Sequence, residues 1–168
     1  LDDSFYAGEL IEKLYGATLY ANRLIHHRGR TVPEYNAMGC TLTATGITTD
    51  AVDFIQVGDS RAYLVRKDKI YPITKDQTLV NQLIDAGLIK PEEAETHALK
   101  NVILEGLGTQ NEVYPDGVRL IPQSDDILLL CSDGLSDKLT DVDLLRVVLN
   151  NRDNLKNACQ VLIQEANE

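Results

Sequence analysis

The heptapeptide VGDSRAY at residues 57–63 and the decapeptide LLLCSDGLSD at residues 128–137 follow one pattern. In each, an apolar run that is typical of a β-strand leads directly to an aspartate beside a glycine: Asp59 in the first and Asp133 in the second. A carboxylate at the end of an apolar strand is costly to keep charged unless backbone donors, an arginine or a metal ion satisfy it. Two such aspartates suggest a site for a hard cation.

Both tripeptides, GDS and SDG, are also common turn sequences. In a turn, the aspartate caps its own backbone and the glycine supplies a positive φ. Taken singly, each tripeptide fits a plain turn better than a metal ligand. The strand before each aspartate, and the longer string of specific residues around it, favour the ligand interpretation.

Length and composition indicate an ordinary globular domain. The chain has 168 residues, of which 43% are hydrophobic and 25% charged, so one good core can form. The formal net charge of −10 disfavours nucleic acid and anionic membranes as partners, because the summed field repels both. The sequence lacks an apolar run of about 20 residues and a signal-peptide pattern, and we therefore predict a cytoplasmic protein.

The three cysteines are odd in number, far apart and placed in apolar segments. We predict that they are buried, reduced thiols in a reducing compartment: Cys40, Cys131 and Cys159.

Hydrophobic periodicity predicts an α+β fold. A long amphipathic helix is expected over residues 4–28, capped by Asp3 or Ser4. Three β-like runs with short connections then predict an antiparallel meander, at 40–47, 51–57 and 61–66. A tight turn at 67–69 and a strand at 70–73 complete this region.

The second half of the sequence changes pattern twice. Short helical pieces are expected between 78 and 106, one of them opened by Pro91. Strands follow at 118–121 and 127–132, and two closing helices at 140–149, with a cap at Thr140, and at 154–166. Antiparallel strands combined with helices in this order predict a layered fold in which helices cover sheet faces.

Five strings occur in order along most of the chain: MGCTL (38–42), VGDSRAY (57–63), TKDQTLV (74–80), NVIL with LGT (101–104 and 107–109) and CSDGLSD (131–137). In this order and approximate spacing they resemble the bacterial form of the metal-dependent serine/threonine protein phosphatases of type 2C. The resemblance implies a layered α-β-β-α sandwich of antiparallel sheets flanked by helices. It also implies a helical flap inserted beside the active site, here at about 78–106, within a single partial phosphatase domain that spans residues 1–168.

The chemistry implied by the resemblance is hydrolysis of phosphoserine and phosphothreonine in signalling proteins. A water that bridges two Mn²⁺ or Mg²⁺ ions attacks the phosphorus, and bacterial members hold a third, weaker ion. Such a pair of ions activates the water and clamps the phosphoryl oxygens, and carboxylates are suitable ligands for it. Asp133 matches a family metal ligand, and Asp59 matches its partner at the third metal.

Four other residues are weaker candidates. Arg61 is expected to anchor its strand end by pairing with a carboxylate. His97 falls in the flap, where residues near the substrate and the third metal lie in similar proteins, although a surface histidine is the simpler interpretation. Asp76 and Asp137 either support the ligands from behind or cap local turns.

The sequence also departs from the family pattern. The family's N-terminal strands, which carry a phosphate-gripping arginine and the bridging Asp-Gly string, have no counterpart here, and neither does the last strand with its Asp-Asn pair. The letters RDN at 152–154 imitate that pair but read as a helix cap, and Gln77 stands where similar proteins commonly have His. We therefore expect an incomplete domain that is inactive as it stands, from an active parent protein. Exposed sheet edges are expected to make the fragment self-associate.

Two other functions remain open at this point. One is a non-catalytic, phosphatase-like binding or regulatory module, in which Asp59 and Asp133 are only turn residues; the retention of both acids disfavours it. The other is a phosphohydrolase with an aspartate nucleophile. That class needs a second Asp two positions after the first, at the end of a parallel strand. Asp133 lacks that neighbour, and the expected strands are antiparallel.

Overall fold

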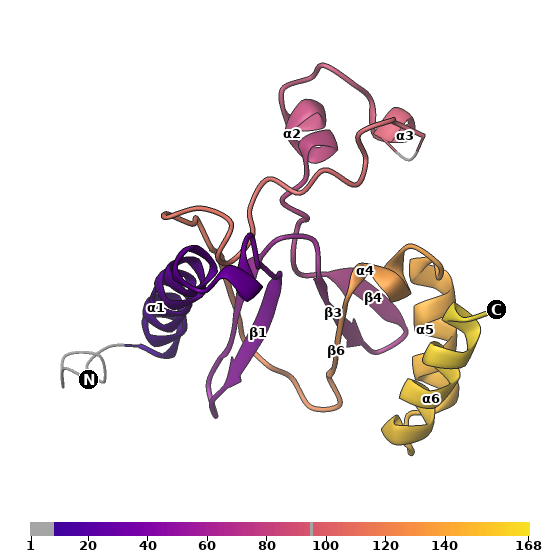
Figure 1. Cartoon of the computed structure of the whole chain (residues 1–168). Coiled ribbons are helices and arrows are strands. Elements are labelled where there is room, and N and C mark those ends of the chain that lie inside the picture. Colours follow the sequence, from indigo (N-terminus) through magenta and orange to yellow (C-terminus); the bar gives the residue numbers. More distant parts are fainter. Residues whose placement is uncertain (1–8, 95) are drawn as a thin grey trace. The chain divides into compact units, whose positions relative to one another are not determined.

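The chain divides into two compact units, each with its own antiparallel sheet (Figure 1). The computed structural model describes residues 9–94 and 96–168. The first unit runs to Asp59 and resumes at Asp76–Ile121, and the second consists of Ser60–Lys75 and Pro122–Glu168. The predicted mixture of helices and antiparallel strands is confirmed, whereas the stacking of the two sheets into one sandwich domain stays a prediction.

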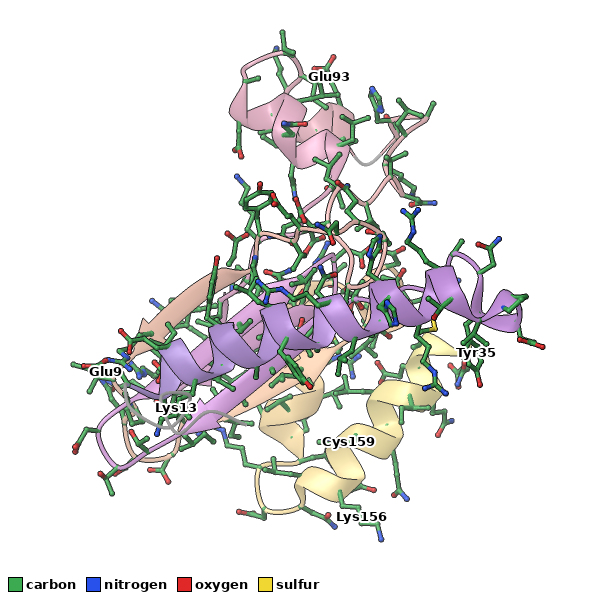
Figure 2. The ribbon with its side chains drawn as sticks, turned by 60° about the vertical axis from the view of Figure 1, so that its left-hand side comes forward. Glu9, Lys13, Tyr35, Glu93, Lys156 and Cys159 are labelled. Carbon is green, nitrogen blue, oxygen red and sulfur yellow. The ribbon has the colours of Figure 1, made fainter. Side chains whose placement is uncertain are left out.

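The first unit is built on a three-stranded sheet in the order β1-β2-β5. The strands are β1 (Leu42–Ile47), β2 (Val52–Val57) and β5 (Asp116–Leu120), and β2 is buried along its whole length. Helix α1 (Leu10–Thr31) packs against all three strands, and a 3-10 turn, η2 (Pro33–Tyr35), follows it. Figure 2 shows α1 lengthwise, with Glu9 at its start and Tyr35 beyond its end.

A buried asparagine fixes a long loop of this unit to α1. The side chain of Asn22 is 1% exposed; its Oδ1 accepts the N–H of Gly108 at 2.7 Å. Its amide group donates to the carbonyls of Gln110 and Asn111, both at 3.2 Å. Buried polar groups are tolerated when they are hydrogen-bonded in this way, and the loop that returns to β5 is therefore held on the helix.

An ion pair crosses the same sheet. The fully buried Asp53 on β2 lies opposite Arg119 on β5, and the guanidinium donates to both carboxylate oxygens, at 2.6 and 3.0 Å. Arg119 also pairs with Glu9, the residue before α1. Bidentate pairing of this kind offsets part of the desolvation of the carboxylate, although burial still raises the pKa of Asp53, and it ties the start of α1 to the sheet edge.

The short helices expected between 78 and 106 are present as α2 (Leu79–Asp85) and α3 (Pro91–Ala94). The two ends of this segment are joined by main-chain hydrogen bonds. The N–H of Leu79 donates to Val102 O at 2.9 Å, and the N–H of Leu104 donates to Gln77 O at 2.8 Å. We call residues 77–79 and 102–104 the flap root.

The second unit is built on a sheet in the order β4-β3-β6. Its strands are β3 (Arg61–Arg66), β4 (Lys69–Pro72) and β6 (Ile127–Cys131), and its helices are α4 (Asp133–Ser136), α5 (Asp141–Asn150) and α6 (Leu155–Ala166). Four side chains form its buried core: Tyr63, Leu144, Val147 and Leu162. The apolar faces of α5 and α6 thus pack against β3, the central strand of this sheet.

Two predicted helix caps are confirmed in this unit. Thr140 and Asp143 form a capping box at the start of α5, and the side chain of Asn154 accepts the N–H of Asn157 at the start of α6. The RDN letters at 152–154 therefore end in a helix cap, as expected. The predicted cap at Asp3 or Ser4 lies outside the described residues, and the described part of α1 begins at Leu10.

The predicted meander through 40–66 is wrong at its second turn. β2 pairs with β1 and β5, whereas β3 pairs with β4 and β6, so the chain changes sheets at residues 58–60. The short connection imitates a hairpin, but both edges of each strand are taken by other partners. A short loop between two strands therefore did not imply that they pair.

The predicted burial of the cysteines is also wrong at two positions. Cys40 and Cys159 are exposed, and Cys131 is half-buried. Cys159 follows the buried Ala158 on α6, and one helical step turns its side chain away from the core face. In the described part of the chain, none of the helices is both long and apolar enough to cross a bilayer.

The ion pair between Arg66 and Asp126 should make the second unit sensitive to acid. The guanidinium donates to both oxygens of Asp126, at 2.8 and 2.7 Å, and these bonds, with the N–H of Gln123, hold the pKa of that carboxyl below its ordinary value. The lowered pKa contributes stability above the ordinary aspartate pKa that is lost as the pH falls through the folded-state pKa. We therefore expect Asp126→Asn to destabilise the chain at pH 7 by an amount that shrinks toward zero in acid. Urea denaturation of the wild type and of Asp126→Asn between about pH 7 and pH 2 measures the free energy of unfolding of each. A difference between the two that does not change with pH would contradict the prediction.

Candidate functional site

Asp59 lies in a tight turn directly after β2. The preceding Gly58 is buried and has a φ of +99°, a conformation that glycine adopts without strain. A Cβ at this position would lie 2.5 Å from Cγ2 of Thr41, so the close approach of the residue before β1 also requires glycine. Asp59 itself is half-buried. The turn thus presents a carboxylate at the end of a fully buried strand, as the sequence predicts.

The backbone of Gly58 is held by two glutamines. Its N–H donates to Oε1 of Gln77 at 2.8 Å, and its carbonyl accepts the N–H of Gln77 at 2.9 Å and Nε2 of Gln56 at 3.0 Å. Gln77 also donates through Nε2 to Asp116 Oδ2 at 2.8 Å and to Tyr114 O at 3.0 Å. The turn before Asp59 is therefore bound to the flap root and to the start of β5.

Asp133 lies at the first position of α4, directly after β6. Ser132 is the N-cap residue, Asp133 is exposed, and its carbonyl accepts the N–H of Asp137 at 2.8 Å. Leu135, on the same short helix, packs against the core of the second unit. The core thus anchors the turn while its acidic side chain stays accessible.

Asp59 belongs to the first unit and Asp133 to the second. Each carboxylate is placed within its own unit at the end of an apolar strand. Their meeting at one metal ion stays a prediction.

The weaker candidates have local roles in the structure. Arg61 donates to the hydroxyl of Tyr63 at 3.3 Å, and burial raises the pKa of that hydroxyl although the arginine opposes this. His97 is half-buried, and its Nδ1 accepts the N–H of Leu99 at 3.1 Å, which closes a turn in the flap. The carboxylate pairing predicted for Arg61, and the place predicted for His97 near the substrate and the third metal, stay predictions.

The two remaining aspartates lie outside strands and helices. Asp137 follows α4 as its C-cap residue and is exposed, which fits the capping interpretation. Asp76 lies in the loop before α2, where its main-chain carbonyl accepts the side-chain amide of Asn81 at 2.9 Å, and capping by its side chain stays a prediction. Their support of metal ligands also stays a prediction.

The two aspartates carry the type of donor atom that hard divalent cations bind. Asp59 and Asp133 offer carboxylate oxygens, which Mn²⁺ and Mg²⁺ prefer. Within residues 9–94 and 96–168, however, His, Cys, Asp and Glu form no group of three or more that could hold a metal. Two carboxylates by themselves would supply only part of the coordination shell of such an ion.

Sequence reasoning missed the bonding role of Gln77. It treated this residue only as a departure from the family pattern, whereas the side chain joins three segments of the first unit. The one available signal was a polar side chain with both a donor and an acceptor, placed between the strand at 70–73 and the flap. The sequence does not show which groups this side chain bonds.

Comparison with known proteins assigns the fold and the motifs to one family. A family model described as protein phosphatase 2C matches residues 7–161. The serine/threonine protein phosphatase PstP of Mycobacterium tuberculosis is 38% identical over 148 residues, which cover 88% of this chain and 29% of PstP. The protein phosphatase PhpP of Streptococcus pneumoniae is 38% identical over 127 residues, which cover 76% of this chain and 51% of PhpP. The chain thus spans about half, or less, of the length of these relatives.

Solved structures of phosphatases with similar sequences also match the fold of this chain. The crystal structure of PstP matches 98% of this chain, and 69% of the PstP chain, with a TM-score of 0.87 and 35% identity. A structure of the PstP catalytic domain in complex with two manganese ions matches 95% of this chain and 66% of its own, with a TM-score of 0.82 and 34% identity. The motif strings, the antiparallel sheets and these matches lead to one conclusion: the chain belongs to the protein phosphatase 2C family.

Proposed function

We propose that this chain is part of a metal-dependent phosphatase that removes phosphate from phosphoserine and phosphothreonine in proteins. The observation that carries the proposal is the placement of Asp59 and Asp133. Each follows an apolar strand: Asp59 comes after Gly58, which has a positive φ, and Asp133 comes after the helix N-cap residue Ser132. The names of the relatives, which are serine/threonine phosphatases, support the reaction type.

In this proposal, Asp133 and Asp59 hold Mn²⁺ or Mg²⁺, in a site with two or three ions. When bound, these ions would supply an activated water and neutralise charge on the phosphoryl oxygens. The two manganese ions in the PstP complex favour manganese. The chain's own part is to fix two carboxylates on turns that the cores of the two units anchor, because imprecise ligands weaken a metal site.

The setting follows from the same reasoning. The substrates are phosphoproteins, and the enzyme takes part in bacterial signalling in the cytoplasm. The net charge of −10 disfavours nucleic acid and membrane surfaces as partners. Self-association through sheet edges stays a prediction for the chain by itself.

The alternative is a non-catalytic binding or regulatory module, in which Asp59 and Asp133 are only turn residues. Among the described residues, His, Cys, Asp and Glu form no metal-binding group of three or more. The proposal concerns the activity of the whole protein, and we expect the chain by itself to be inactive.

Metal removal tests the proposal. The full-length gene product should hydrolyse a phosphothreonine peptide with added Mn²⁺, and a chelator should reduce the rate by at least about 10³-fold, because metal ions provide several kcal/mol of transition-state stabilisation. Restoring Mn²⁺ should restore the rate. Phosphate release measures both, and the isolated 168-residue chain is the negative control. A full-length protein that is inactive with Mn²⁺ and with Mg²⁺ would establish the binding module instead.

A further inference from the structure

Gln77 satisfies both backbone groups of Gly58. Its side-chain Oε1 accepts the Gly58 N–H at 2.8 Å, and its main-chain N–H donates to the Gly58 carbonyl at 2.9 Å. Gly58 is buried, and its positive φ and its contact with Thr41 allow only glycine there. A buried N–H that loses its acceptor is costly, so the conformation of this turn depends on Gln77.

The same residue joins the turn to two other segments. Its Nε2 donates to Asp116 Oδ2 and to Tyr114 O, at the start of β5. Its carbonyl accepts the N–H of Leu104, which closes the flap root. A single residue thus links three segments: its side chain contacts the residue before Asp59 and the start of β5, and its main-chain carbonyl contacts the base of the inserted helices.

We propose that Gln77 is a positioning residue that fixes the Gly58-Asp59 turn and couples it to the flap root, so that the orientation of the Asp59 carboxylate toward a divalent cation depends on it. This inference rests on the proposed function, because it takes Asp59 as a metal ligand. The coupling itself lies wholly within the first unit. Mutation of a residue that holds a metal ligand in place without touching the metal typically lowers metal affinity by about 10- to 100-fold.

Two substitutions separate the contributions of this side chain. Gln77→Met keeps a similar length but removes the acceptor and the donor. Gln77→His restores both, because a neutral imidazole carries one acceptor nitrogen and one N–H donor. Asn22→Leu is the matched control: it also removes a buried amide that bonds loop backbone in the first unit, but its partners are Gly108, Gln110 and Asn111.

The first measurement is amide hydrogen exchange in the full-length protein without metal, relative to the slowest amides of β2. In Gln77→Met, the Gly58 amide should exchange at least about tenfold faster, the factor of one ordinary hydrogen bond, and the Leu104 amide should become faster with it. In Gln77→His and Asn22→Leu, the exchange rates of the Gly58 and Leu104 amides, relative to the slowest amides of β2, should stay near those of the wild type. A fast Gly58 amide beside an unchanged Leu104 amide would overturn the coupling.

The second measurement is Mn²⁺ affinity by titration calorimetry on the same proteins. Gln77→Met should bind the weakest Mn²⁺ at least about tenfold less tightly, and Gln77→His should recover to within about threefold of wild type. Equal losses in Gln77→Met and Asn22→Leu would overturn the inference, because general destabilisation would then explain both. If Gln77→Met does not fold, Gln77→Leu, which also removes both the acceptor and the donor, takes its place with the same expected direction.

The outcomes also distinguish this inference from the proposed function. If the wild-type protein binds no Mn²⁺ and hydrolyses no phosphopeptide, the proposed function and the metal part of the inference both fail. The exchange data then still decide whether Gln77 holds the turn. If the wild type binds Mn²⁺ and Gln77→Met changes neither exchange nor affinity, only the inference fails.

Discussion

Replacing Asp133 by asparagine should lower the Mn²⁺-dependent phosphatase activity of the full-length protein by about 10³-fold, because a metal site contributes several kcal/mol and each tenfold in rate corresponds to about 1.4 kcal/mol. The amide keeps the size of the side chain and removes the charge. Because Asp133 is exposed and its helix is anchored by Leu135, the fold should not change. The measurements are initial rates of phosphate release over a range of Mn²⁺ concentrations and the unfolding temperature.

Asp153→Asn is the matched control for this substitution. Asp153 is also exposed, lies in the same unit, and belongs to the RDN string that imitates the family's Asp-Asn pair in letters. Because the structure places this string at the cap of α6, the variant should keep full activity. Full activity in Asp133→Asn would remove Asp133 from the metal site, whereas a loss in Asp153→Asn would show that the effect is not specific to Asp133.

Gly108→Ala should destabilise the first unit by about 2–5 kcal/mol, the sum of left-handed backbone strain and overpacking. Gly108 has a φ of +84°, and a Cβ there would lie 2.2 Å from Cγ2 of Ile25 and 3.0 Å from the carbonyl oxygen of Met38. Ile25 cannot turn away easily, because a β-branched side chain in a helix has one preferred rotamer. The shift would also strain the bond between Asn22 and the Gly108 N–H.

Gly87→Ala adds the same methyl group without the collision. Gly87 has a φ of +69°, and the space around its Cβ position is open to 4 Å. Its cost should therefore be the backbone strain alone, about 1–2 kcal/mol. Urea denaturation followed by circular dichroism compares the two variants. Similar losses for both would show that the packing of Gly108 against α1 contributes little.

Local features of this fold could be predicted from the sequence. The apolar runs at 51–57 and 61–66 mark β2 and β3 to within a residue, and Thr140 and Asn154 cap their helices as expected. These signals work because strand periodicity and capping depend on neighbours in the chain. The positions of Asp59 and Asp133 directly after strands were accessible for the same reason.

Long-range pairings could not be predicted in this way. The loop between β2 and β3 imitates a hairpin, and only the later strands β5 and β6, which take the free edges, separate the two into different sheets. The acid inside the apolar run VDFIQV signals a buried charge, but its partner Arg119 lies 66 positions away. The metal-ligand roles proposed for Asp59 and Asp133 come from the family resemblance, because periodicity does not reveal them.

The division of the chain into interleaved units affects how it is synthesised. β3 leaves the ribosome early, but one of its two neighbours, β6, comes from residues 127–131, after the whole first unit has been made. Loop closure over such a separation is slow, and an unpaired strand is prone to aggregation until its partner arrives. During translation, β3 and β4 must therefore wait as an open hairpin while the chain between them and β6 emerges. A single protease cut cannot separate the two units from each other, since each is built from two stretches that alternate along the polypeptide.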